Sequence, residues 1–346
     1  MDINTALILL QDGITSGAVY VLLAVALVMV FTVTRIVLVS QGEFIVFSVL
    51  TVAAYQQGLP PGAVWIVAGA AVIATAMEVG VRLQERSCSG LGTRVLVLLV
   101  IPLCCAGFSR FGVDQGSPYW IQCASAVALV TSMGPAIYRI AFKPLAEATP
   151  LVLLIAAIAL HLLLLGLGLV VFGPEGSRLP EFAFQAPRIG SLALSAQGIV
   201  VVSISAVMIG VLYLLFDRTL LGKALRATAV SRTGAQLVGV SPGLAGELSL
   251  TLAALIGAAS GILIGPITTI YYDSGFLLGL KGFVGAIVGG LGGYGLAAMG
   301  SLVVGLMEAF ASFWASPYKE IIVFTLIVPV LMWRSVRDPH VQEEEQ

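Results

Sequence analysis

The chain has 346 residues, of which 59% are hydrophobic and only 10% are charged. Soluble domains carry roughly 45–50% apolar and roughly 25% charged residues, so this chain has too few charges to cover a soluble surface. Its mean hydropathy is +1.05, and its net charge of −1 gives no field that would attract nucleic acid. The composition therefore predicts an all-α, polytopic membrane protein without a nucleic-acid partner.

Continuous apolar runs predict about eleven transmembrane helices in a single membrane domain, 1–346. A spanning helix needs about 20 apolar residues, so little chain remains for a soluble domain. Asp2 and Asp12 flank the first run where a secretory signal would be basic, and we expect this helix to be retained. The predicted spans are 13–34, 43–58, 62–81, 94–109, 119–140, 150–172, 197–216, 243–265, 281–293, 296–314 and 318–333.

The distribution of Lys and Arg predicts the orientation, because basic residues concentrate on the cytoplasmic side. We expect the N-terminus outside and the C-terminus inside. The predicted inner side then holds Arg35, Arg82, Arg86, Arg94, Arg139, Lys143, Arg218, Lys223, Arg226, Arg232, Arg334 and Arg337. The predicted outer or boundary group is Arg110, Arg178, Arg188, Lys281 and Lys319.

Glycines recur at intervals of four residues in two predicted helices. Small residues at this spacing lie along one helix face and let a neighbouring backbone approach closely. We expect tight packing there, and a contact that slides during a conformational change is compatible with it. The residues are Gly257, Gly261, Gly265, Gly285, Gly289 and Gly293.

No motif indicates catalysis, metal binding or a nucleotide site. The chain has two histidines, His161 and His340, and no phosphate-binding glycine loop that ends in Lys and Ser or Thr. The four cysteines are expected to be buried thiols. They are Cys88, Cys104, Cys105 and Cys123. We therefore expect no catalytic residue, no metal and no cofactor in this chain.

The inner connection 217–242 is predicted to be a short amphipathic helix. Asp217 or Thr219 is suited to cap it. Its face residues at helical spacing are Leu220, Leu221, Ala224, Leu225 and Thr228; Lys223 and Arg226 lie off that face, and the small residues Ala227 and Ala229 lead to the stop signals Gly234 and Gly239. Such a helix can dock on a soluble partner or lie on anionic lipid, and the pattern leaves both open.

Several ionisable residues fall within or beside the predicted spans, where they are functional candidates by default. Ser40 and Glu43 form a predicted capping box, with Arg35 as a local charge partner for Glu43. A carboxylate at the mouth of a pathway is the alternative for Glu43. Glu78 precedes Arg82 by four residues, which predicts a pair on one helix face.

The remaining charges are harder to place from the sequence. Glu308 has no charge within four residues, so it must pair with a group on another helix, face water or be protonated. Lys281 is a possible partner that the sequence does not assign. His161 lies in a leucine-rich run, which favours a satisfied core histidine over a proton relay. The segment after Gly265 is irregular and polar, which predicts the outer mouth of a pathway. The pathway candidates are Gln41, Glu43, Tyr271, Tyr272, Asp273, Lys281 and Glu308.

Five segments in order resemble the permease subunit of branched-chain amino acid ABC importers of the leucine-isoleucine-valine type. They are Gly13-Ile-Thr-Ser-Gly-Ala-Val-Tyr20, Thr34-Arg-Ile36 with Gln41-Gly-Glu-Phe44, Tyr138-Arg-Ile-Ala-Phe-Lys-Pro-Leu145, Leu225-Arg-Ala-Thr-Ala229 with Leu237-Val-Gly-Val240, and Lys281-Gly-Phe283 with Gly289-Gly-Leu-Gly-Gly293 and Gly305-Leu-Met-Glu308. The resemblance covers most of the chain outside 83–118, a stretch that we expect to be an added hairpin.

The resemblance implies a transmembrane subunit in a bacterial inner membrane, surrounded by lipid. It would form a pathway with a second, homologous permease, and two cytoplasmic ATPase subunits would bind ATP and Mg. A periplasmic solute-binding protein would deliver the solute, and 217–242 would be the coupling loop. A self-sufficient secondary transporter or channel is the alternative, and a membrane-embedded enzyme is disfavoured because no clustered polar site is visible.

Overall fold

The computed structural model describes residues 3–84, 91–182, 188–189, 192–193, 195–291 and 293–337. Nearly all of this chain is helical, apart from a small antiparallel hairpin of β1 (Arg188–Ile189) and β2 (Leu192–Ala193). Among the described residues, nine helical segments are long and apolar enough to cross a membrane. The prediction of an all-α polytopic membrane protein is confirmed.

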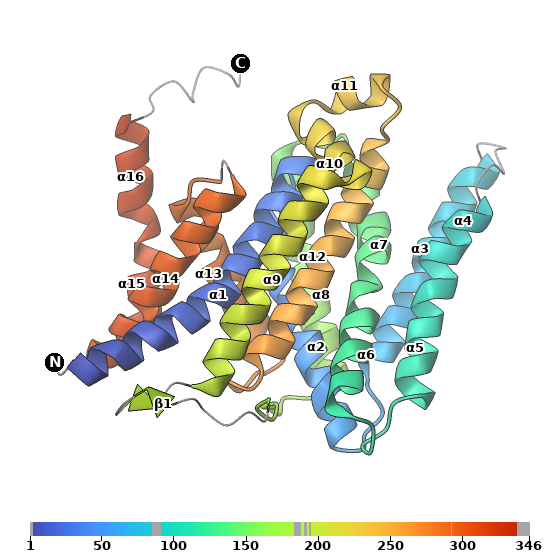
Figure 1. The fold of residues 1–346 in the computed structure, drawn as a ribbon. Helices are drawn as coiled ribbons and strands as arrows, with labels where there is room; N and C mark the ends of the chain where they lie inside the picture. Colours follow the sequence, from blue (N-terminus) through green and yellow to red (C-terminus); the bar gives the residue numbers. More distant parts are fainter. Residues whose placement is uncertain are drawn as a thin grey trace.

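The helices lie side by side along one direction, and the start of the first helix and the end of the last helix lie toward opposite ends of the bundle (Figure 1). Short π-helical or 3₁₀ segments join α4 to α5, follow α7 and precede α15. The helices are α1 (Ile3–Thr34), α2 (Gln41–Gln56), α3 (Ala63–Gln84), α4 (Leu91–Val95), α5 (Ile101–Phe111), α6 (Tyr119–Thr131), α7 (Met133–Ile137), α8 (Pro150–Phe172), α9 (Ala196–Arg218), α10 (Leu220–Val230), α11 (Arg232–Leu237), α12 (Pro242–Ile264), α13 (Ser274–Val288), α14 (Tyr294–Trp314), α15 (Lys319–Thr325) and α16 (Ile327–Arg337).

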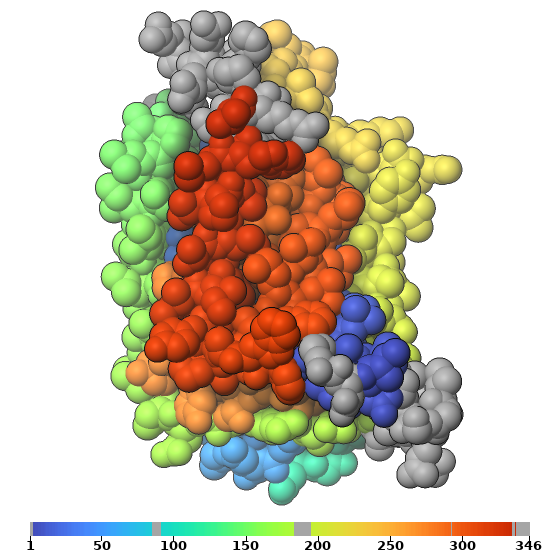
Figure 2. Space-filling view, turned by 90° about the vertical axis from the view of Figure 1, so that its left-hand side faces the viewer, coloured from blue at the N-terminus to red at the C-terminus, as the bar shows by residue number. Residues whose placement is uncertain are grey.

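Helix α1 is the centre of the bundle and packs against α9, α12, α13 and α14. Its close approach to α14 depends on glycine, because a Cβ on Gly13 would lie 2.8 Å from the Cα of Leu306. In Figure 2 the C-terminal helices cover this side of the molecule and leave mainly the N-terminal end of α1 in view. From residue 17 to residue 30, α1 is buried on all sides, which explains why it is hydrophobic around its whole circumference there and not along one stripe.

Helices α2 and α13 are too short to cross a membrane. With 16 and 15 residues at about 1.5 Å per residue, each covers about 24 Å or less of a hydrocarbon core about 30 Å thick. After α1 ends, residues 35–40 return into the bundle as non-helical chain. The side-chain Nε2 of Gln41 donates a hydrogen bond of 3.0 Å to the carbonyl oxygen of Ala253, the midpoint of α12. Helix α2 therefore begins halfway along the bundle.

The N-terminus of α13 meets the N-terminus of α2 at this depth. A Cβ on Gly275 would lie 2.8 Å from the carbonyl oxygen of Gly42, so only glycine fits at the contact. From there α2 runs toward one face of the bundle, and α13 runs toward the other. We call this meeting point of Gly42 and Gly275 the midplane junction.

The predicted span 281–293 was wrong at both ends, since α13 starts at Ser274 and stops at Val288. The early glycines of α13 resemble helix breakers in the sequence, but they are contact residues. The helix instead stops where Gly290 and Leu291 adopt φ values of 91° and 53°. Gly293 lies beyond this turn with nothing within 4 Å of its Cβ position, so the packing role expected for it is also wrong.

The other glycines of the two predicted rows lie in contacts. Gly257 and Gly261 of α12 face α2, and Gly265 meets Leu179. Gly285 and Gly289 of α13 face α14.

The segment 83–118, predicted as an added hairpin, contains α4 and α5, which contact α3 and α6 at one edge of the bundle (Figure 1). Whether it is an addition to a family pattern stays a prediction.

We expect Gly261→Leu to lower the stability of the fold. A Cβ at this position would lie 2.6 Å from the carbonyl oxygen of Ile45, and overpacking of a tight contact costs about 1–3 kcal/mol. Thermal unfolding in detergent measures the effect. The matched control is Gly69→Leu, because Gly69 has nothing within 4 Å of its Cβ position. Equal melting temperatures for both variants would contradict the contact.

Candidate functional site

A carboxylate lies fully buried at the midplane junction. Glu43, in the first turn of α2, has 0% exposure, and its Oε1 lies 2.9 Å from Nδ1 of His161. His161 is the midpoint of α8, and its ring stacks on Phe276 of α13 with centroids 5.0 Å apart. Three helices thus meet around one buried acid–base pair.

The predicted capping box is absent. Ser40 precedes α2 but makes no side-chain cap, because its φ and ψ of −76° and 10° are not the extended conformation that a capping residue adopts. The contact of Glu43 is with His161 and not with Arg35. The pairing expected within the connection 35–44 is therefore wrong, and the carboxylate is directed to another helix.

One face of α13 at the midplane junction is open. Asp273, just before the helix, is exposed, and Phe276 and Leu277 are 38% and 39% exposed. Gly275, two residues later, contacts Gly42, so Asp273 lies near half depth and not at the level where α12 ends. A charged side chain at such a depth is costly against lipid and normally faces a bundle interior or a water-filled cavity. This face of α13 is suited to border a pathway.

The two tyrosines of the predicted mouth lie above this face. The ring of Tyr271 packs at Gly176, and the half-buried Tyr272 lies within 4 Å of the Cβ position of Gly168. Chain from the preceding loop packs beside them, because Ser177 pairs with Ile270 through two backbone hydrogen bonds of 2.9 Å, and Tyr271 stays 46% exposed.

A second buried cluster joins α1, α13 and α14. Nζ of Lys281 lies 2.5 Å from Oε1 of Glu308, and the hydroxyl of Tyr20 donates to Oε2 at 2.6 Å. The possible pairing of Glu308 with Lys281 is therefore observed. The placement of Lys281 in the outer or boundary group is wrong, because its side chain is buried within the bundle. Glu308 also lines a cavity of about 500 Å³ with Asp12 and Ser312.

A third cluster links the C-terminal end of α3 to the chain that follows α7. Glu78 lies 2.9 Å from Arg82, as its spacing predicts, and also 2.8 Å from Arg139 and 3.2 Å from Lys143. The negative charge of Glu78 is thus neutralised by cations in fixed positions, which is typical of an ion-pair cluster that stabilises the fold.

The segment 217–242 forms α10 and α11. Thr219 caps α10, since its Oγ1 accepts a hydrogen bond of 3.0 Å from the backbone N–H of Gly222. The residues buried against the bundle are Gly222, Leu225 and Thr228. Leu220 and Leu221 are 84% and 55% exposed, so only part of the predicted apolar face is buried against the bundle.

The remaining residues of this segment differ in exposure and in their position relative to the helix ends. Lys223 and Arg226 are exposed, whereas Ala224, Ala227 and Ala229 are half-buried. Gly239, with φ of 83°, follows α11, while the predicted stop Gly234 lies inside α11. The break comes instead at Ser231, whose hydroxyl caps α11 by accepting from the N–H of Gly234.

Arg232 anchors this segment to α1. Its guanidinium donates to the carbonyl oxygens of Thr34 at 2.6 Å and Ala146 at 3.0 Å. Thr34 is the last residue of α1, where unpaired carbonyls attract a cation. Sequence reasoning missed this contact because its partners are backbone atoms 198 and 86 residues away.

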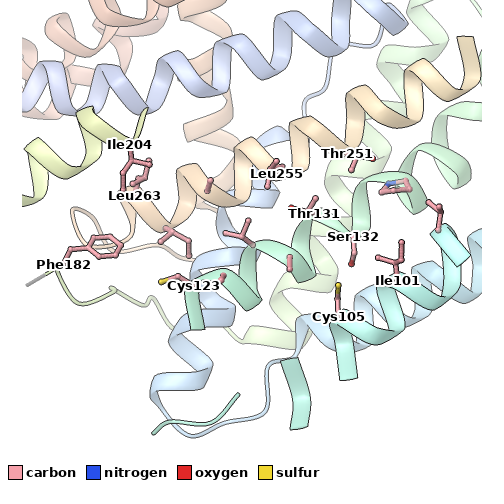
Figure 3. A pocket seen from close by; sticks show the side chains of 17 residues that line it. Ile101, Cys105, Cys123, Thr131, Ser132, Phe182, Ile204, Thr251, Leu255 and Leu263 are labelled. Atoms are coloured by element: carbon pink, nitrogen blue, oxygen red, sulfur yellow. The ribbon is translucent and has the colours of Figure 1, made fainter. Parts of the chain in front are cut away.

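An apolar cavity lies elsewhere, between α5, α6 and α12 (Figure 3). It has a volume of about 660 Å³, and its wall is almost wholly apolar, so it suits hydrocarbon better than a polar solute. Among the described cysteines, only Cys123 is buried; Cys104 is exposed, contrary to expectation. Cys88 lies outside the described residues. Within the described chain no group of three His, Cys, Asp or Glu side chains is placed to hold a metal.

Long apolar helices around buried ion pairs, with two half-helices that meet inside, define a polytopic membrane transport protein. The chain matches the model of the family described as branched-chain amino acid transport system / permease component over residues 9–331, and it belongs to this family.

Two relatives carry the name of the same transport system. The chain is 28% identical to the high-affinity branched-chain amino acid transport system permease protein BraD of Pseudomonas aeruginosa over 234 residues, which is 65% of this chain and 76% of BraD. It is 26% identical to the corresponding protein LivH of Escherichia coli over 240 residues, 66% of this chain and 76% of LivH. No solved structure matches the chain.

We expect Lys281→Met to destabilise the protein strongly, because it leaves the Glu308 carboxylate without its cation. Removing one partner of a buried pair costs about 3–5 kcal/mol, whereas replacing both by apolar groups is often neutral. Thermal unfolding of Lys281→Met, Glu308→Met and the double variant measures this coupling. A double variant that loses the sum of the two single losses would show that the pair is not coupled.

Proposed function

We propose that this chain is the permease subunit of an ATP-driven importer for branched-chain amino acids or a related small polar solute. The observation that carries the proposal is the anchored segment 217–242. It presents exposed Leu220, Leu221 and Leu237 beyond the end of the bundle while Arg232 holds it to the last carbonyl of α1. Exposed apolar side chains on short helices are suited to insert into a groove on a soluble partner.

The partners follow from this assignment. A second, homologous permease completes the pathway, and two cytoplasmic ATPase subunits bind ATP and Mg and dock at 217–242. A solute-binding protein delivers the solute from the periplasm to a permease that is embedded in the lipid of a bacterial inner membrane. The family description and the names of BraD and LivH support the transport role and the membrane location. This chain contributes no catalytic residue to ATP hydrolysis.

Residues in contact with one another connect the segment 217–242 to the pathway candidates at the midplane junction. Arg232 holds Thr34, and residues 35–40 connect Thr34 directly to α2. Helix α2 starts at the midplane junction with Gly275. We propose that closure of the ATPases moves α10 and α11, and that this motion shifts the start of α2 against α13. In this proposal, a small shift at the tight contact closes the pathway to one side of the membrane and opens it to the other.

One observation favours a second candidate function, a self-sufficient secondary transporter. Glu43 and His161 form a buried acid–base pair at half depth, where ion-coupled transporters place their coupling groups. Uptake driven by a proton or sodium gradient through this chain alone would support the alternative. Stimulation of separately added ATPase subunits would support the proposal.

We expect Leu221→Asp, Arg226→Glu and Leu225→Pro to leave membrane insertion intact and to abolish stimulation of the ATPases. The first two change the exposed surface of α10, and proline breaks the helix at a cost of about 3 kcal/mol. ATPase activity of the co-expressed complex is the measurement. Leu83→Asp is the control, because Leu83 is a similarly exposed leucine at the end of α3. Normal ATPase stimulation and transport in all three variants would contradict docking at α10.

A further inference from the structure

The charges at half depth do not balance. Glu308 is matched by Lys281, and Glu78 is matched by three cations nearer the end of α3. Glu43 contacts only His161, a group that carries a charge only when it is protonated. Asp273, the other carboxylate beside the midplane junction, has no ion-pair partner among the described residues. The junction therefore has an excess of acidic groups.

The hydrogen bonds of Glu43 are also incomplete. Both carboxylate oxygens are buried, and neither accepts a hydrogen bond with good geometry from the described chain, although Nδ1 of His161 lies 2.9 Å from Oε1. An ionised carboxylate has about four acceptor sites, and burial without donors is costly. A buried acceptor that lacks donors is suited to a ligand that brings several N–H groups, such as a primary ammonium.

The buried pair is linked to the open face of α13 by one aromatic side chain. The ring of Phe276 stacks on His161 on one side and is 38% exposed on the other. Phe276 is thus the observed contact between His161 and the open face, and a rotation of its side chain breaks no backbone hydrogen bond. Phe276 and Leu277 also offer an apolar surface beside the carboxylate. An ammonium group attached to a short aliphatic body matches this combination of charge and surface.

We propose that Glu43 binds the ammonium group of the transported solute at the midplane junction, and that His161 contacts the Glu43 carboxylate when no solute is bound. Phe276 separates this site from the open face of α13. The inference rests on the proposed function, since a pathway must pass the junction, and it assigns a solute-binding residue to that pathway. Its ligand class is a primary amine with a small branched aliphatic group.

Chemical rescue in the purified full chain in lipid nanodiscs tests the proposal. The probes are 3-methylbutylamine, which is a cation at pH 7, L-leucine, and 3-methylbutanol, which has a similar aliphatic body and no charge. His161→Ala leaves a space beside Glu43, and the amine and L-leucine are expected to raise the melting temperature of this variant by about 2–4 °C while the alcohol does not. The double variant His161→Ala/Glu43→Gln is expected to show no such rise.

A comparison that does not require the alanine variant to fold uses the wild-type chain and Glu43→Gln, which keeps the shape of the side chain. Stabilisation of the wild type by the amine and its loss in Glu43→Gln would support the proposal. Equal stabilisation by amine and alcohol, or an amine effect that survives in Glu43→Gln, would overturn it. Asp114→Asn is the matched control, because Asp114 is an exposed carboxylate in the connection between α5 and α6, remote in sequence from the helices that form the pair.

The experiment separates this inference from the proposed function. Amine binding that depends on Glu43 in a chain that fails to stimulate any ATPase would leave the site intact and refute the importer. ATP-driven uptake by a complex that contains Glu43→Gln at the wild-type rate would refute the site and leave the importer.

Discussion

A helix that begins inside a bilayer must satisfy the N–H groups of its first turn without water, and this constraint explains the centre of the molecule. Helices α2 and α13 both begin there, and their N-termini meet at Gly42 and Gly275. Bundle packing alone does not require such an arrangement, because two uninterrupted helices would cross at lower cost. Broken helices are tolerated where protein surrounds them or where they line a cavity, and in transporters they mark the binding region.

The buried charges divide into two kinds. The ion pair of Lys281 and Glu308, supported by Tyr20, links three helices and is matched in charge. Glu43 differs, because its only ionic contact is an imidazole and its oxygens lack donors. A matched pair braces the bundle, whereas an unmatched carboxylate next to an exposed face of α13 is available to a ligand. This difference distinguishes a structural role from a transport role among residues that look alike in the sequence.

Much of the fold was predictable, because lipid imposes long apolar runs and each predicted span overlaps one or more helices of the structure, although α2 and α13 are too short to cross a membrane. The predictions that were wrong depend on contacts between distant segments. The start of α13 was hidden because Gly275 reads as a helix breaker until Gly42 is placed against it. Glu43 read as a capping residue because its partner lies on α8, 118 positions further along the sequence. For Glu308 the sequence offered Lys281 as a possible partner but did not assign it, and the structure shows the pair.

The central claim is that this chain supplies a pathway and receives its motion from ATPase subunits attached near α10 and α11. Reconstitution of the purified chain in liposomes, alone and with the ATPase subunits encoded beside it, tests this claim most directly. The account predicts no accumulation of labelled leucine against a gradient by the chain alone, and accumulation with ATP in the complex when the solute-binding protein is present. Concentrative uptake by the chain alone, in the absence of any ATP-hydrolysing subunit, would contradict it.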